Sequence, residues 1–134
     1  MGLNLLLDSH TLLWWWCCPR LLSPRVHGLL SDPEQPVWVS AASLLEISQA
    51  QKRGQLPELA PVIWELPELV RQEGFQLLAI TARHGLMAGQ WRPLRGSGAL
   101  DHTARLLLAQ AQLENLTLVS ADPTLRSAAG RCLW

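Results

Sequence analysis

The sequence predicts an α/β fold, in which a parallel sheet of four to five strands carries helices on both faces. Short apolar runs alternate with longer segments of helical character, and polar or acidic residues follow the runs directly. Parallel strands joined through helices require right-handed crossovers, which cover both faces of the sheet. A chain of 134 residues suits one hydrophobic core, so residues 1–134 are expected to form a single domain.

Local signals place the elements of the first half of the chain. Ser23 before Pro24, and Ser40 before an alanine-rich segment, are typical helix starts, whereas Pro19 and Gly54 are typical stops. The predicted elements are a strand over Leu3–Leu7, a helix over Thr11–Cys18, a helix from Pro24 to about Leu30, a strand over Val37–Val39 and a helix over Ala41–Arg53.

The second half continues the alternation. Pro67 should kink or divide a helix over Leu59–Glu73, and Thr81 should cap a helix that runs to about Trp91. In the helix after it, Leu106 and Leu113 are seven residues apart and are expected on the core side. The other predicted elements are a strand over Phe75–Ile80, a loop over Arg92–Gly98, a helix over Asp101–Glu114, and strands over Thr117–Val119 and Cys132–Trp134.

Charge and hydropathy exclude several functions. The formal net charge is +0, with 11 basic and 11 acidic residues, so nucleic-acid binding cannot depend on overall attraction. The apolar runs Leu5–Leu7 and Leu12–Cys18 are too short to span a membrane, and the first residues lack a signal-peptide pattern. A cytoplasmic protein is therefore expected. Its three cysteines have no metal-site spacing and are expected to be reduced thiols.

Three acids follow strands of the predicted sheet. Asp8 ends the first strand, Glu46 lies about two turns into the helix after the second, and Asp122 follows the fourth. Ligands of open parallel sheets bind beyond the carboxyl ends of the strands, so these side chains can converge there. Carboxylate oxygens are the ligands that Mg²⁺ and Mn²⁺ prefer. The alternative is that Asp8 and Asp122 only cap helices and that Glu46 faces solvent.

The segments around these acids, taken together and in order, resemble a known family. Leu5–Trp14, Val39–Ile47 and Leu118–Pro123 are similar to the PIN-domain nucleases, in particular to VapC-type toxins of type II toxin–antitoxin systems. The resemblance spans nearly the whole chain. It implies a Mg²⁺- or Mn²⁺-dependent endoribonuclease that hydrolyses RNA phosphodiesters, forms a homodimer and is neutralised by a cognate antitoxin. It also implies that Asp8, Glu46 and Asp122 are catalytic metal ligands.

Two positions depart from the family pattern. Such proteins usually carry an aspartate where Ala104 stands, directly before Arg105-Leu106-Leu107-Leu108-Ala109-Gln110-Ala111. Asp101, one helical turn earlier, is the candidate replacement as a metal ligand and catalytic acid, although it can equally be an ordinary charge at a helix start. The basic residue usual after the Glu46 segment is also absent, because Ala50 falls near that place.

Other residues support the predicted site. Arg92, Arg95 and Arg105 flank the predicted loop and are candidates for holding RNA phosphates, the alternative being a solvated basic loop. Ser120 can hydrogen-bond a ligand carboxylate or water. His10 and Thr11 are expected to pack or to support the ligands. His84 and His102 have no matched partner in the sequence, so neither is proposed as a general base.

The run Trp14–Trp16 beside Cys17 and Cys18 is too apolar for an exposed helix. Successive helical residues point about 100° apart, so all three tryptophans cannot face one core. An exposed remainder would favour a dimer or antitoxin surface.

Two functions of different classes remain. The first is the metal-dependent ribonuclease, and the second is a PIN-like binding or regulatory protein that lost activity through Ala104. Nucleotide binding is disfavoured, since no glycine-rich loop follows the first strand and no Walker lysine is present.

Overall fold

The computed structural model describes residues 2–92 and 100–134 and has a five-stranded parallel sheet of order β3-β2-β1-β4-β5. Each pair of neighbouring strands is parallel, so the α/β prediction is confirmed. The strands are β1 (Leu5–Leu7), β2 (Val37–Ser40), β3 (Gln76–Leu78), β4 (Thr117–Val119) and β5 (Cys132–Leu133).

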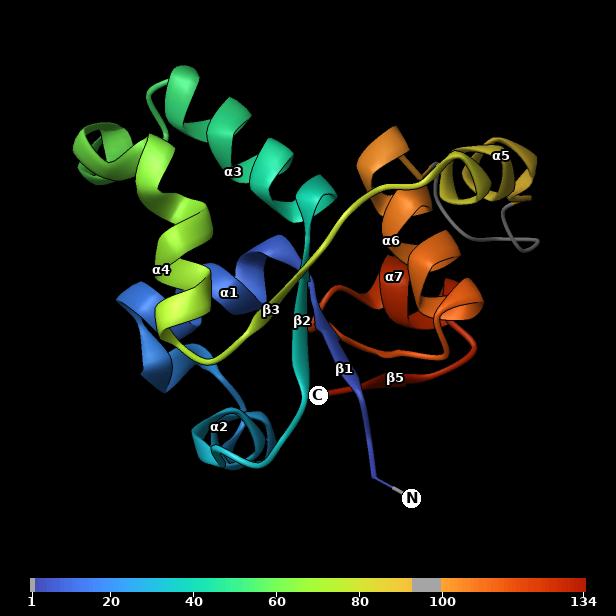
Figure 1. Cartoon of the computed structure of the whole chain (residues 1–134), viewed down its shortest axis with the longest axis horizontal. Coiled ribbons are helices and arrows are strands. Elements are labelled where there is room, and N and C mark those ends of the chain that lie inside the picture. The colour runs from blue at the N-terminus through green and yellow to red at the C-terminus, as the bar shows by residue number, and fades with distance from the viewer. Residues whose placement is uncertain (1, 93–99) are drawn as a thin grey trace.

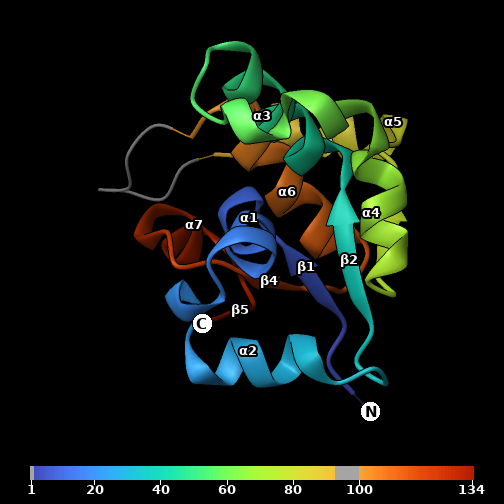
Figure 2. The ribbon, with the colours of Figure 1, turned by 90° about the vertical axis from the view of Figure 1, so that its left-hand side faces the viewer.

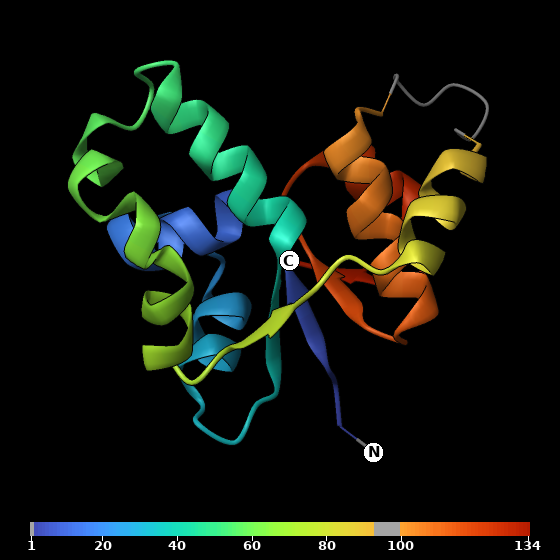
Figure 3. The ribbon, with the colours of Figure 1, turned by 45° about the horizontal axis from the view of Figure 1, so that its top comes forward.

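Helices cover both faces of this sheet. Figure 1 shows α1 to α4 on one side and α5 to α7 on the other, and Figure 3 shows the same division from above. The α-helices are α1 (Ser9–Cys17), α2 (Pro24–Ser31), α3 (Ala41–Lys52), α4 (Leu66–Gln72), α5 (Ala82–Gln90), α6 (His102–Leu113) and α7 (Pro123–Ala128). The structure also has two 3-10 helices. They are η1 (Pro19–Leu21), which follows α1, and η2 (Pro57–Glu65), which follows α3.

The central strand β1 is buried on both faces. Leu5 and Leu7 belong to one apolar cluster, which includes Leu12 of α1, whereas Leu6 belongs to a second cluster with Leu107 of α6. Successive strand residues point to opposite faces, so one three-residue strand contributes to both cores. This burial explains why β1 is a run of leucines rather than an alternating pattern.

Most predicted helix starts are confirmed by their caps. The side chains of Ser23, Ser40 and Thr81 each accept a hydrogen bond from a backbone N–H in the first turn of α2, α3 and α5 respectively. Gly54 follows α3 with φ of +83°, the left-handed conformation that glycine tolerates at a helix end. Helix α1 starts at Ser9, two residues before the predicted start.

Two predictions about helices are wrong in detail. The predicted break at Pro67 falls instead before Leu66, where η2 gives way to α4. Pro67 then lies in the first turn of α4, where its missing N–H costs no intrahelical bond. In α6 the fully packed side chains are those of Leu107 and Leu108, whereas Leu106 and the more distant Leu113 are only half-buried.

The tryptophans of α1 are packed rather than exposed. Trp14, Trp15 and Trp16 are all half-buried against the α1-side core. Trp14 meets Trp134 edge to face at a centroid distance of 5.6 Å, and the Trp15 Nε1–H donates to Glu73 at 3.0 Å. The exposed indole of the described chain is that of Trp64 in η2, with 92% of its surface accessible. Of the Trp14–Cys18 run, only Cys17 is therefore exposed, and none of its three tryptophans is.

Two further observations concern the chain as a whole. In the part of the chain that the structure describes, no helix combines the length and apolarity needed to cross a membrane. The predicted loop over Arg92–Gly98 lies outside the described residues except for Arg92, which is exposed.

Candidate metal and RNA site

A cavity of about 430 Å³ opens where the carboxyl ends of the strands meet α1, α3, α6 and α7. Figure 2 shows α3 above α1 with α7 beside them. The four acids that the sequence singled out all line this cavity: Asp8, Glu46, Asp101 and Asp122. They come from four separate segments, and the parallel sheet brings them to one edge.

Asp8 is the most deeply held of these acids, with only 3% of its surface exposed. It caps α1, and its Oδ1 accepts from the Thr11 backbone N–H at 2.9 Å and from Thr11 Oγ1 at 2.6 Å. Thr11 Oγ1 also lies 3.1 Å from the Val119 carbonyl oxygen of β4. Thr11 thus has the supporting role expected of it, and the carboxylate is fixed between two neighbouring strand ends.

Glu46 is half-buried in α3 and is joined to the same junction. Ser9, which directly follows Asp8 and is itself buried, donates its hydroxyl hydrogen bond to Glu46 Oε1. This contact ties the side chain of α3 to the first residue of α1. The alternative that Glu46 simply faces solvent does not describe its position in the cavity.

Asp101 and Asp122 are exposed residues that cap α6 and α7 respectively. Asp101 Oδ1 accepts from the Ala104 N–H at 2.8 Å, and Asp122 Oδ1 accepts from the Thr124 N–H at 2.9 Å. Ser120 Oγ, fully buried, accepts from the Asp122 backbone N–H at 3.0 Å. The capping alternative therefore describes Asp8, Asp101 and Asp122 correctly, and all three also face the cavity.

Ala104 lines the same cavity, one turn into α6 from Asp101. The position where the family usually places an acid is thus on the cavity wall, and this chain presents a methyl group there.

The donor set suits a hard divalent cation in chemistry but is not assembled around one point. All four acids offer carboxylate oxygens, which Mg²⁺ and Mn²⁺ prefer. Within residues 2–92 and 100–134, however, no three His, Cys, Asp or Glu side chains lie close enough together to hold a metal ion. A cation would need to draw these carboxylates closer or keep several water ligands.

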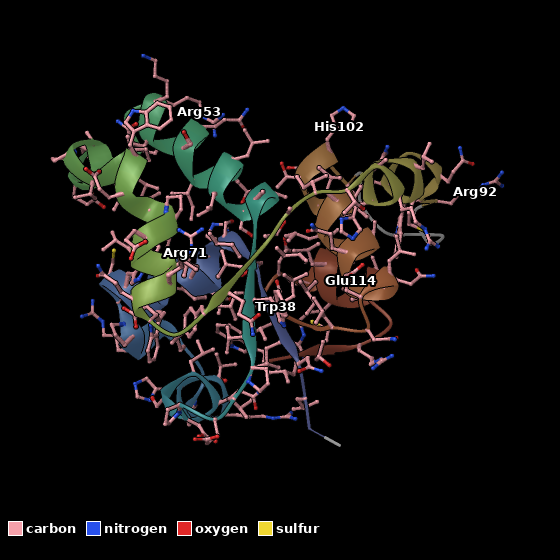
Figure 4. All side chains as sticks on the ribbon, in the orientation of Figure 1. Trp38, Arg53, Arg71, Arg92, His102 and Glu114 are labelled. Carbon is pink, nitrogen blue, oxygen red and sulfur yellow. The ribbon has the colours of Figure 1, made fainter. Side chains whose placement is uncertain are left out.

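The predicted RNA-binding arginines are not part of the described cavity wall. Arg92 lies at the outer edge of the molecule beyond α5 (Figure 4). Arg105 belongs to α6 and has a buried Nε with no hydrogen-bond partner among the described residues. Arg95 lies outside the described residues. Arg53, at the end of α3, lines the cavity instead.

Sequence reasoning missed Ser9 and Arg53 as cavity residues. Arg53 follows Glu46 by seven positions, a spacing that puts both on one face of a helix, so helical periodicity was a usable signal. The link from Ser9 to Glu46 joins residues far apart in the sequence and has no local signal. His10 also lines the cavity and is exposed, with its ring 6.0 Å from that of Trp14.

His84 has a partner that the sequence did not reveal. Its Nε2 lies 3.1 Å from Glu114 Oε2, and its Nδ1 accepts from the Thr81 backbone N–H at 3.0 Å. It is buried away from the cavity, with 1% of its surface exposed.

A five-stranded parallel α/β sheet of this order, with an acid-lined cavity at its carboxyl edge, is a PIN-like fold. The family profile of the PIN domain matches residues 5–131, and the chain belongs to this family. PIN domains are typically metal-dependent nucleases. A search of the curated proteins finds no match to the sequence.

Solved structures with the same fold include several toxin–antitoxin proteins. VapBC2 from Rickettsia felis, bound to a DNA fragment from its promoter, matches with a TM-score of 0.71 and 13% identity, over 98% of both chains. A toxin–antitoxin complex from Klebsiella pneumoniae matches with a TM-score of 0.62 and 16% identity, over 98% of this chain and 97% of the other. FitAcB from Neisseria gonorrhoeae matches with a TM-score of 0.59 and 16% identity, over 97% of this chain and 96% of the other. At these identities the likeness establishes the fold.

Proposed function

We propose that the protein is a VapC-like endoribonuclease that hydrolyses RNA phosphodiesters with Mg²⁺ or Mn²⁺ at the cavity. The observation that carries this proposal is that four acids from four separate segments, those of α1, α3, α6 and α7, line one cavity. Among the residues that the structure describes, four carboxylates and one guanidinium, that of Arg53, line the cavity, so these residues repel phosphate unless a cation is bound. A cation between the acids and the substrate resolves this conflict.

The proposed ligands are Asp8, Glu46 and Asp122, with Asp101 as a fourth. Both hydrogen bonds that the described residues make to the Asp8 carboxylate go to Oδ1, so Oδ2 is available to a ligand. Glu46 is similarly fixed through Oε1, with Oε2 available. When bound, Mg²⁺ or Mn²⁺ supplies Lewis acidity, which lowers the pKa of a bound water and stabilises charge on the phosphate.

The remaining cavity residues have proposed roles in binding RNA. Arg53 is placed to contact a phosphate at the edge of the cavity, because a guanidinium fork fits phosphate oxygens. Arg92, Arg95 and Arg105 stay candidates for phosphate contacts farther along the strand. Ser120 supports Asp122 by accepting its backbone N–H.

A second function is favoured by one specific observation. Ala104 on the cavity wall, together with the absence of an assembled three-residue metal group in the described ranges, favours weak metal binding. A PIN-fold protein with weakened catalysis, which still binds RNA or its antitoxin, is the second candidate.

The proposed partners are RNA, a cognate antitoxin and a second copy of the chain in a homodimer, all acting in the cytoplasm. Support comes from the fold, which is similar to that of proteins solved in toxin–antitoxin complexes. Sedimentation of the purified chain tests the homodimer, since a monomer has a mass of 14.9 kDa.

Cleavage of structured RNAs by the purified protein in Mn²⁺, compared with EDTA, tests the proposal. We expect products in Mn²⁺ that disappear in EDTA and in the Asp8→Asn variant. RNA that is bound but never cut at any Mn²⁺ concentration would favour the second function. Neither binding nor cleavage would exclude both.

A further inference from the structure

A buried polar network joins the two helices that face each other across the cavity. Gln110 of α6 is fully buried, and its Oε1 accepts from Ser40 Oγ at 2.5 Å. Ser40 is the last residue of β2 and caps α3, since its Oγ accepts from the Ala42 N–H at 2.9 Å. The start of α3 is therefore bonded directly to the middle of α6.

The amide of Gln110 adds a third strand end to this network. Its Nε2 donates to the Ala79 carbonyl oxygen at 3.2 Å, just after β3, and lies 3.4 Å from Nδ1 of His84. The His84 Nδ1 accepts from the Thr81 N–H, so the ring proton is on Nε2 and is directed at Glu114. Every polar atom of the Gln110 side chain is used, as expected for a buried amide.

The same face of α6 leads from this network to the cavity. Thr103, Leu107 and Gln110 are spaced four and three residues apart, which places them in one row along the helix. Thr103 and Leu107 line the cavity, and Gln110 continues the row toward β2. Helices α3 and α6 pack against each other, and the Ser40–Gln110 hydrogen bond joins the residue that caps α3 to α6.

We propose that Gln110 is a positioning residue that sets the separation of α3 and α6, and with it the distance between Glu46 and the acid at the start of α6. The helix-separation part stands independently, whereas the metal-affinity part rests on the proposed function. Gln110 is not among the residues that line the cavity, so we infer that it acts through the helices. Breaking one bond of this network would leave a buried polar group without a partner, which costs free energy in an apolar interior.

The test measures the distance between the free ends of the two helices. Nitroxide labels replace two exposed side chains, in Lys52→Cys and His102→Cys, on a background carrying Cys17→Ser, Cys18→Ser and Cys132→Ser. Figure 4 shows His102 and Arg53, the neighbour of Lys52, at these free ends. Double electron–electron resonance then gives the distribution of distances between the two nitroxides, with and without Gln110→Met.

We expect Gln110→Met to broaden the distribution and to shift its mean by about 2 Å, the scale of helix shifts in packed proteins. Gln112→Met, at an exposed position of the same helix, is the matched control and should leave the distribution unchanged. Ser40→Ala breaks the same bond from the other side and should act like Gln110→Met if that variant fails to fold. An unchanged distribution in a folded Gln110→Met or Ser40→Ala protein overturns the proposal.

Calorimetric titration with Mn²⁺ tests the second part on the unlabelled chain. We expect Gln110→Met to weaken Mn²⁺ binding by about tenfold, the lower range for residues that support metal ligands. Unchanged affinity alongside a changed distance refutes the metal part. If the native chain binds no Mn²⁺ while the distance changes, the proposed function fails and the positioning role stands.

Discussion

The two walls of the cavity are built differently. The first wall, made of Asp8, Ser9 and Glu46, is buried or half-buried. Ser9 donates a hydrogen bond to Glu46, and Asp8 accepts hydrogen bonds from Thr11. The second wall, made of Asp101, Ala104 and Asp122, has two exposed helix caps and one methyl group. The carboxylates of the first wall are buried or half-buried, whereas those of the second are exposed and hydrogen-bonded to backbone N–H groups.

This difference suggests how the site divides its tasks. Carboxylates held by hydrogen bonds are oriented before a ligand arrives, so little ordering entropy is lost on binding. Exposed caps keep a carboxylate hydrated and engaged with a backbone N–H, and a ligand must compete with both. We therefore expect the second wall to limit the affinity of the proposed metal site, and the first wall to contribute more to stability.

The largest expected effect is on stability at the first wall. Asp8→Ala removes the cap of α1 and leaves the buried Thr11 N–H and hydroxyl without this acceptor. We expect a loss of about 2–4 kcal/mol in the free energy of unfolding. Urea denaturation measures it. Asp122→Ala, the exposed cap of α7, is the matched control and should cost only about 0.5–1 kcal/mol. Equal losses in the two variants would remove the distinction between the walls.

Ala104→Asp should strengthen metal binding at the second wall by adding a carboxylate there. A carboxylate 4 Å from a divalent ion at an effective dielectric near 20 contributes on the order of 4 kcal/mol per unit charge before solvation offsets it. Since the cavity is open to water, we expect Mn²⁺ affinity to rise only about tenfold. Isothermal titration calorimetry measures this change, with Ala104→Asn as the uncharged control. Equal affinity of the two variants would place position 104 outside the metal's reach.

Ser9→Ala should loosen the first wall without removing a ligand. Glu46 loses the hydroxyl that holds its Oε1, and Ser9 itself is buried. We expect about 1 kcal/mol of lost stability and a weakening of Mn²⁺ binding by about fivefold. Thermal unfolding and metal titration measure the two quantities. Ser9→Thr, which keeps the hydroxyl, should restore the affinity if the hydrogen bond is responsible.

Asp101→Asn should have the smallest effect. Asparagine caps helices about as well as aspartate, so the stability change should stay within about 0.5 kcal/mol. The exposed charge is lost, and Mn²⁺ affinity should fall about twofold to threefold. A loss as large as that of a first-wall ligand in the same metal titration would show that Asp101 has taken over the role of the missing acid at position 104.

Local signals in the sequence were sufficient for most of the fold. Apolar runs marked the strands because β1 and β4 are buried on both faces, and serine or threonine before a helix marked its start because the cap is a local bond. The division of the segment around Pro67 was predicted, but it lies just before Leu66 rather than at Pro67, because proline fits both a break and a first turn. Packing against the sheet, rather than sequence, decides between them.

The candidate site was predicted through position at strand ends. Asp8 and Asp122 were found because acids after buried strands are unusual, and both line the cavity. The bonds from Ser9 to Glu46 and from Ser40 to Gln110 join residues far apart in the chain, so only the folded structure reveals them. Whether these acids bind a metal stays a prediction.

The position of β1 has a consequence for how the chain folds. Leu5 pairs with Val37 on one side and with Thr117, near the other end of the chain, on the other. Pairings between distant segments form slowly, because the intervening loop must close first. Until Thr117–Val119 is synthesised and docked, a strand of three leucines has one open edge, and such edges invite pairing with other chains. On the ribosome, the centre of the sheet therefore keeps an open edge long after β2 and β3 have been synthesised.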